Sequence, residues 1–205
     1  MGRQAFENSL KRSATASGPD ALEQFMMAQQ PDNSRIVVLH GDVNEHTISA
    51  VIAQLLHLAN ISREPIYMVV STYGGSVDEM FSLYDTVKFL PCPVHTIGLG
   101  KVMSAGVLLL AAGEKGKRMI GRSARIMMHP VSGGAIGNVF EVMHESKEHK
   151  RIHDLMVTSL VTETNLKLEE IEKIMNAGHD YYITADDAIK MGIVDRIVGD
   201  TKPKK

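Results

Sequence analysis

An apolar strand pattern followed by an amphipathic helix pattern occurs three times in succession in this sequence. The strand patterns are IVVLH at 36–40, IYMVVS at 66–71 and PVHTIGLG at 93–100. Each is followed by a turn and then by a segment with apolar residues at helical spacing. Strands that alternate with helices favour a largely parallel sheet. This threefold repeat limits the fold more strongly than any other feature of the sequence, and it predicts an α/β domain.

The rest of the chain has weaker but readable signals. A buried helix is expected over 104–112 and a tight turn with short strands up to His129. An apolar stripe between charged residues predicts a long helix over about 138–163, and we expect Asn165 to end it in the left-handed conformation. The remaining expected elements are helices over 168–178 and 184–192 and a strand over 193–198.

The domain organisation follows from length and local composition. At 205 residues the chain suffices for one domain with a sizeable core. Residues 1–34 are rich in turn-forming residues and poor in large apolar ones, so we expect a mobile N-terminal arm. We expect a single domain over 35–199 and a frayed tail over 200–205.

Composition excludes several classes of protein. A formal charge of −2 gives no indication of nucleic-acid binding. Cys92 is the only cysteine, so no intrachain disulfide can form and a cytoplasmic location is the simpler expectation. The first residues lack the apolar core of a signal peptide, and the longest apolar run, 105–112, is too short for a bilayer. We expect no contact with membranes.

A serine nucleophile needs a base, a group that orients the base, and donors for an oxyanion. Ser104 lies where a strand ends and an apolar helix begins, His129 ends a short strand, and Asp180 follows a helix-closing glycine. Taken singly, each has a more ordinary interpretation. Ser104 could cap the helix, His129 could be structural, Asp180 could cap the next helix, and the glycines of YGGS at 73–76 could form a plain turn.

Taken together, these segments resemble the Clp protease proteolytic subunit (ClpP) family from Arg35 to about Val198. The strings that carry the resemblance are RIVVLHGDVNEHTISAVIAQLLHLA, STYGGSV, GKVMSAGVLLLAAGEKGKR, SARIMMHPVSGG and HDYYITADDAIKMGIVDRIV. The resemblance implies the ClpP/crotonase-like fold, a spiral of repeated strand–strand–helix units from which a long handle helix protrudes.

The resemblance also implies roles for individual residues. Ser104 matches the nucleophile, His129 the base and Asp180 the orienting acid, with Asp186, Asp187 and Glu172 as less favoured alternatives for the acid. Gly75 and Ala105 match the positions whose backbone N–H groups form the oxyanion hole. The segment that matches the substrate-pairing strand consists of Gly133, Gly134, Ala135, Ile136 and Gly137.

The resemblance further implies an ATP-dependent serine endopeptidase of protein quality control that cleaves unfolded polypeptides and short peptides. Family members form two stacked seven-membered rings with the active sites inside, and the helix at 138–163 matches the element through which the rings meet. An AAA+ unfoldase uses the ATP, so we expect no cofactor in this chain itself. The identity of that partner stays open.

Three alternatives compete with this interpretation. His144, His149 and His153 lie on the long helix, and the last two have metal-ligand spacing, but their charged neighbours favour a solvated face and no metal site is expected. A crotonase-type acyl-CoA enzyme has the same kind of fold but needs no serine triad. A catalytically silent ring subunit would keep the fold without the reaction.

Overall fold

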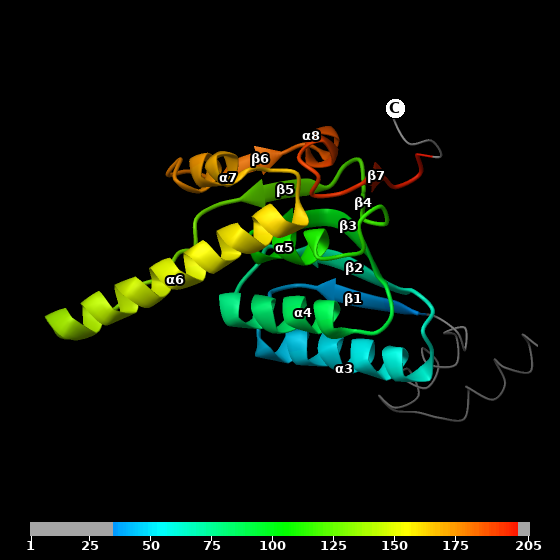
Figure 1. The fold of residues 1–205 in the computed structure, drawn as a ribbon, viewed down its shortest axis with the longest axis horizontal. Coiled ribbons are helices and arrows are strands. Elements are labelled where there is room, and N and C mark those ends of the chain that lie inside the picture. Colours follow the sequence, from blue (N-terminus) through cyan, green and yellow to red (C-terminus); the bar gives the residue numbers. More distant parts are fainter. Residues whose placement is uncertain (1–34, 201–205) are drawn as a thin grey trace, which may run out of the picture. The chain divides into compact units, whose positions relative to one another are not determined.

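The computed structural model describes residues 35–200 (Figure 1). The strands are β1 (Ile36–His40), β2 (Ile66–Thr72), β3 (Val94–Met103), β4 (Met119–Ile120), β5 (Arg125–Met128), β6 (Tyr181–Ile183) and β7 (Arg196–Ile197). The helices are α3 (Glu45–Ile61), α4 (Val77–Phe89), α5 (Ala105–Ala111), α6 (Val139–Glu163), α7 (Leu168–Met175) and α8 (Ala185–Lys190). The expected arm at 1–34 and the tail at 201–205 lie outside the described residues.

The strands form one sheet that divides at β3. β1, β2, β3, β4 and β7 are parallel neighbours in that order. The middle of β3 pairs with β4, whereas its last residues pair with β5, which is antiparallel to β6. The predicted α/β architecture with a largely parallel sheet is therefore confirmed, and the division of β3 brings β5 beside the end of β3.

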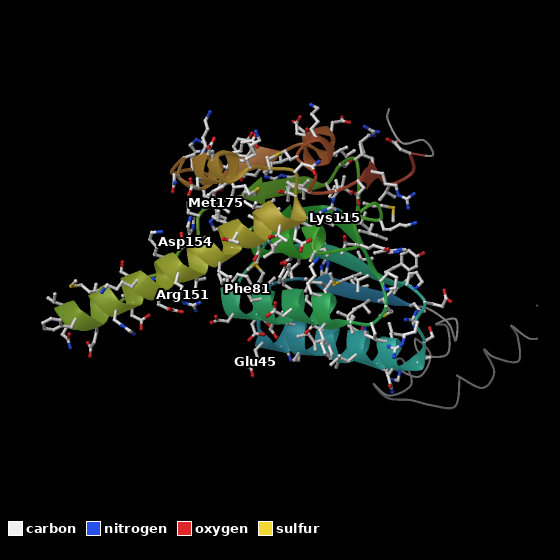
Figure 2. All side chains as sticks on the ribbon, viewed as in Figure 1. Glu45, Phe81, Lys115, Arg151, Asp154 and Met175 are labelled. Carbon is white, nitrogen blue, oxygen red and sulfur yellow. The ribbon has the colours of Figure 1, made fainter. Side chains whose placement is uncertain are left out.

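Helices α3, α4 and α5 pack beside one another, and α5 also contacts β2 and β3. Asn44 begins α3 by accepting a hydrogen bond from the Thr47 N–H, and Ser76 begins α4 by accepting one from the Glu79 N–H. Every residue of α5 is buried, so this helix lies at the centre of the core. Figure 2 draws the side chains on these elements, with Glu45 of α3 and Phe81 of α4 labelled.

Helix α6 protrudes from the sheet and its packed helices, as Figure 1 shows. Its side chains are buried only near its end, at Met156, Val157, Ser159, Leu160 and Glu163. The predicted handle helix is thus present. It ends at Thr164 in extended backbone, and the expectation that Asn165 adopts the left-handed conformation is wrong. The Asn165 N–H instead donates to the Met191 carbonyl, 2.9 Å away.

An ion pair joins the buried Arg118 to the partly exposed Asp195. Arg118 is 3% exposed, and its guanidinium donates to both carboxylate oxygens of Asp195. Burial alone would raise the pKa of Asp195, but hydrogen bonds from Arg118 and from the Gly116 N–H outweigh it and lower the pKa below its ordinary value. This pair ties β4 to the segment that leads into β7.

Candidate active site

Ser104 has the most unusual backbone of the described residues. Its φ of 54° and ψ of −122° make it the only non-glycine residue with positive φ between residues 35 and 200. Such a conformation costs about 1–3 kcal/mol and persists only when the surroundings impose it. The Ser104 N–H donates to the Met127 carbonyl at 2.8 Å, which holds the turn between β3 and α5 in place.

Gly74 is the residue that allows this turn. A Cβ at Gly74 would lie 2.6 Å from the Ser104 Cβ, closer than real side-chain carbons approach. Gly74 therefore makes room for Ser104. The ordinary interpretation of Ser104 as a helix cap is wrong, because its side chain makes no capping hydrogen bond to α5.

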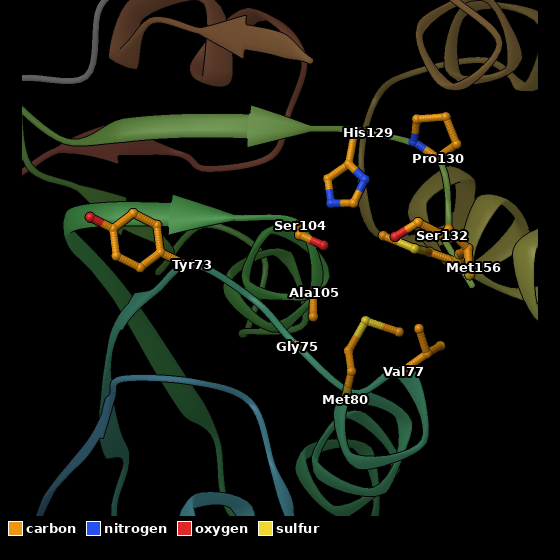
Figure 3. Close-up of a pocket in the computed structure, with 11 residues that line it drawn as sticks. Tyr73, Gly75, Val77, Met80, Ser104, Ala105, His129, Pro130, Ser132 and Met156 are labelled. Atoms are coloured by element: carbon orange, nitrogen blue, oxygen red, sulfur yellow. The ribbon is translucent and has the colours of Figure 1, made fainter. Parts of the chain in front are cut away.

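Ser104 and His129 line the same cavity of about 210 Å³ (Figure 3). The remaining lining residues are Tyr73, Gly75, Val77, Met80, Ala105, Pro130, Val131, Ser132 and Met156. In Figure 3 the His129 ring lies above Ser104 and points into the space between them. The cavity thus contains two of the three predicted triad residues and both predicted oxyanion positions.

Strand register explains why Ser104, His129 and Asp180 come to the same end of the sheet. Met103 pairs with Met127 in the parallel β3–β5 ladder, so Ser104 begins its turn beside the end of β5. In the antiparallel β5–β6 ladder, Met128 pairs with Tyr181. Both strands end there, so His129 directly follows the last paired residue of β5 and Asp180 directly precedes the first paired residue of β6.

The three side chains are not joined by hydrogen bonds in the structure described over residues 35–200. Neither His129 ring nitrogen contacts Ser104 or Asp180 at hydrogen-bond distance, and the Asp180 carbonyl, not its carboxylate, lies 3.1 Å from the His179 ring. Asp180 is exposed and does not line the cavity. The backbone thus brings the residues together, while the side chains are not in a hydrogen-bonded triad.

The alternatives for the acid lie elsewhere. Asp187 accepts hydrogen bonds from Thr184 and Lys190 at the start of α8. Asp186 is 3.9 Å from Arg122, and Glu172 lines a separate recess on α7. None of them adjoins the paired residues Met128 and Tyr181 as Asp180 does.

Two backbone N–H groups are available beside Ser104. Val43 forms a parallel bridge with Gly75, in which the Val43 N–H donates to Gly74 and the Val43 carbonyl accepts from Ser76. The Gly75 N–H consequently takes no part in the bridge. Ala105 is the first residue of α5, where N–H groups have no partner within the helix. Gly75 and Ala105 both line the cavity.

The segment from Gly133 to Gly137 is not a strand among the described residues. It forms an irregular connection between β5 and α6, with Gly133, Gly134, Ile136 and Gly137 exposed. A Cβ at Gly133 would lie 2.8 Å from the ring of His149, so the segment rests against α6 at this point. Its backbone is available to an extended peptide, and its predicted role in substrate pairing stays a prediction.

Comparison with known proteins adds the decisive observation. The family model described as Clp protease matches residues 21–201. The chain belongs to the Clp protease family. It is 36% identical over 166 residues to the ATP-dependent Clp protease proteolytic subunit 2 of Prochlorococcus marinus (strain MIT 9312), covering 80% of this chain and 81% of that protein. The match begins upstream of Arg35, where the resemblance in sequence was expected to begin.

Membership of the Clp protease family makes this chain a serine-type endopeptidase of the Clp type. Within residues 35–200, no group of three or more His, Cys, Asp or Glu side chains is placed to hold a metal ion. Over the same residues, no helix is both long and apolar enough to cross a bilayer.

Sequence reasoning missed several residues that shape the Clp-type cavity. Val77 and Met80 of α4 form its apolar side together with Met156 of α6, which is far from them in the sequence. Helical spacing marked Met156 only as part of an apolar stripe. Tyr73, next to the glycine turn, also lines the cavity, and the Lys101 ammonium lies 4.6 Å from the centre of its ring. No local signal distinguishes these residues from ordinary core or turn positions.

Proposed function

We propose that this chain is the proteolytic subunit of an ATP-dependent Clp-type protease. It cleaves unfolded polypeptides and short peptides inside a ring assembly, with Ser104 as nucleophile, His129 as general base and Asp180 as the residue that orients His129. The strained turn at Ser104 supports this proposal most directly. A cost of about 1–3 kcal/mol at a non-glycine residue beside a histidine-lined cavity is typical of a site kept for function.

The reaction begins when the Ser104 hydroxyl attacks the peptide carbonyl carbon. His129 removes the hydroxyl proton as the Oγ–C bond forms, and the N–H groups of Gly75 and Ala105 donate to the developing oxyanion. The C–N bond then breaks, and His129 gives the proton to the departing amine. Water, deprotonated by His129, attacks the acyl-enzyme and releases the second product together with the free serine.

These steps require hydrogen bonds from His129 to Ser104 and to Asp180, so the side chains of His129 and Asp180 must first move into hydrogen-bond distance. The register supports this adjustment, because Met128, just before His129, pairs with Tyr181, just after Asp180. Catalytic hydrogen bonds are often long before substrate binds. We expect the triad to align when the subunit is assembled and a peptide occupies the cavity.

The apolar side of the cavity accounts for one part of substrate recognition. Val77, Met80 and Met156 lie on one side of Ser104 in Figure 3. An apolar side chain just before the scissile bond would fill this space, while the backbone of 133–137 would pair with the extended peptide. The cavity thereby binds the acyl part of the substrate next to the nucleophile.

Helix α6 supports assembly into two stacked seven-membered rings, a tetradecamer. Val139 is 71% and Phe140 is 83% exposed near its start, and Val142 and Met143 are exposed as well. An exposed apolar set at the tip of a protruding helix is typical of an interface between proteins. We expect Phe140→Asp to separate the rings, which analytical ultracentrifugation would detect as a halving of particle mass.

The partner would be an AAA+ unfoldase that uses ATP, so the chain itself would need no cofactor, and the cytoplasm would be its place of action. Without the partner, only short peptides should be cleaved efficiently. The second candidate, a silent ring subunit, is suggested by the absence of hydrogen bonds within the triad. The acyl-CoA alternative has no support from the family comparison.

The proposal is tested with a fluorophosphonate probe on the purified assembly. We expect labelling of the wild type, complete loss in Ser104→Ala, and strong reduction in His129→Ala. Ser82→Ala, which changes an exposed serine of α4 that does not line the cavity, is the matched control and should still label. An intact two-ring assembly that does not label would favour the silent subunit.

A further inference from the structure

The cavity has a second side whose chemistry differs from the apolar one. Tyr73 lies on the side of Ser104 opposite to Val77 and Met80 in Figure 3, and it is 61% exposed. The Lys101 ammonium lies 4.6 Å from the centre of the Tyr73 ring. A cation held over an aromatic ring thus borders the cavity, where the peptide that follows the scissile bond would leave.

A second cation stands beside the first. Lys101 pairs with Arg125 in the parallel register of β3 and β5, so the two side chains lie on the same face of the sheet. Arg125 begins β5, and His129 directly follows the last residue of that strand. Arg125 also lies over a tyrosine, 5.5 Å from the centre of the Tyr182 ring. The two cations thus stand on neighbouring strands, each over a different tyrosine.

These two cations have no acidic partner in the part of the chain that the structure describes. Neither Lys101 nor Arg125 takes part in an ion pair over residues 35–200. Like charges directly opposite one another on neighbouring strands are unfavourable. The formal charge of the whole protein is −2, so this local excess of positive charge is not a general property of the chain. Such a pair is suited to bind a carboxylate.

We propose that Lys101, Tyr73 and Arg125 form a subsite that favours an acidic residue among the first three positions after the scissile bond. Lys101 precedes Ser104 by three residues, about 10 Å along an extended strand. An extended peptide covers a similar distance in three residues. The subsite rests on the proposed function and adds a substrate class, polypeptides with Asp or Glu just after the cleaved bond.

The test uses six peptides that share one apolar residue before the scissile bond. Three carry Glu and three carry Gln at the first, second or third position after it, and kcat/KM is measured with the assembled protein. We expect a Glu-to-Gln ratio of about 3 to 10 at one or more positions, from a single screened charge interaction near the surface. The ratio should fall toward 1 as salt is raised.

Variants assign the preference to this patch. Lys101→Glu should invert the ratio, and Tyr73→Leu should lower it because the ammonium loses its aromatic support. Lys117→Gln, which removes a cation from an exposed turn, should leave the ratio unchanged. The subsite is overturned if the wild-type Glu-to-Gln ratio of kcat/KM is 1 at all positions, or if Lys101→Glu keeps the wild-type ratio. It is also overturned if Lys101→Gln disrupts assembly, because the cations would then lie at a subunit contact. If the peptides are cleaved without a charge preference, only the subsite is overturned. If none of the six peptides is cleaved, the proposed function is contradicted as well.

Discussion

Replacing Ser104 by glycine should stabilise the fold while it removes the nucleophile. The Ser104 backbone, at φ 54° and ψ −122°, is accessible to glycine without the strain of about 1–3 kcal/mol that a Cβ imposes. Glycine also gives the unfolded chain more freedom, which costs about 0.4–1 kcal/mol. Subtracting this entropic cost from the relieved strain predicts that Ser104→Gly is more stable than Ser104→Ala by about 1 kcal/mol.

Ser104→Ala is the matched control, because it removes the hydroxyl and keeps the Cβ. The Ser104 side chain makes no capping hydrogen bond, so alanine should change the free energy of unfolding by less than about 0.5 kcal/mol. Urea unfolding at equal protein concentration measures both variants, provided their m-values agree. A glycine variant no more stable than the alanine variant would refute the claim that this turn is strained.

Three further predictions concern the acid, the oxyanion position and the buried ion pair. Asp180→Asn should keep the assembly and lower kcat by roughly 10³–10⁴, as expected when the base loses its orienting charge; a loss under tenfold would exclude Asp180 from that role. Gly75→Ala should lower kcat at least about 100-fold, because a Cβ there meets the Val43 carbonyl and displaces an oxyanion donor; wild-type kinetics would contradict this. Asp195→Asn should cost about 1–3 kcal/mol at neutral pH by leaving buried Arg118 without its counter-charge, although Arg118 keeps its bonds to the Ala111 and Glu163 carbonyls. The pKa of Asp195 is lower in the folded state than in the unfolded state, where it is about 3.9. The ion pair therefore stabilises the wild type fully above the unfolded pKa, and this stabilisation is lost as pH falls through the folded pKa. Acid titration of stability should therefore be shallower in Asp195→Asn, and parallel curves would argue against the assignment.

The sequence predicted the elements of the fold better than their ends. Period-two and period-3.6 patterns located β1, α3 and α6 closely, because each has a continuous apolar side. β3 was expected to end at Gly100 but continues to Met103, since pairing with β5 extends it. The expected strand over 193–198 is only two residues long in β7, because it pairs only with the equally short β4.

The candidate site depended on contacts that no local pattern contains. The resemblance to a family proposed Ser104, His129 and Asp180, but only strand register explains why residues so distant in sequence meet at the end of β5. The positive φ at Ser104 was not predictable from its neighbours, since the cause lies in Gly74 and Met127. The pairing of Lys101 with Arg125 likewise arises from the division of the sheet.

The most direct test of the proposed mechanism is to trap its acyl-enzyme. The assembled protein is mixed with an activated ester, quenched in acid at short times, and analysed by intact mass and peptide mapping. The account predicts one acyl group per chain, located on Ser104, and none in Ser104→Ala. An acyl group on another residue, or ester hydrolysis that continues unchanged in Ser104→Ala, would contradict it.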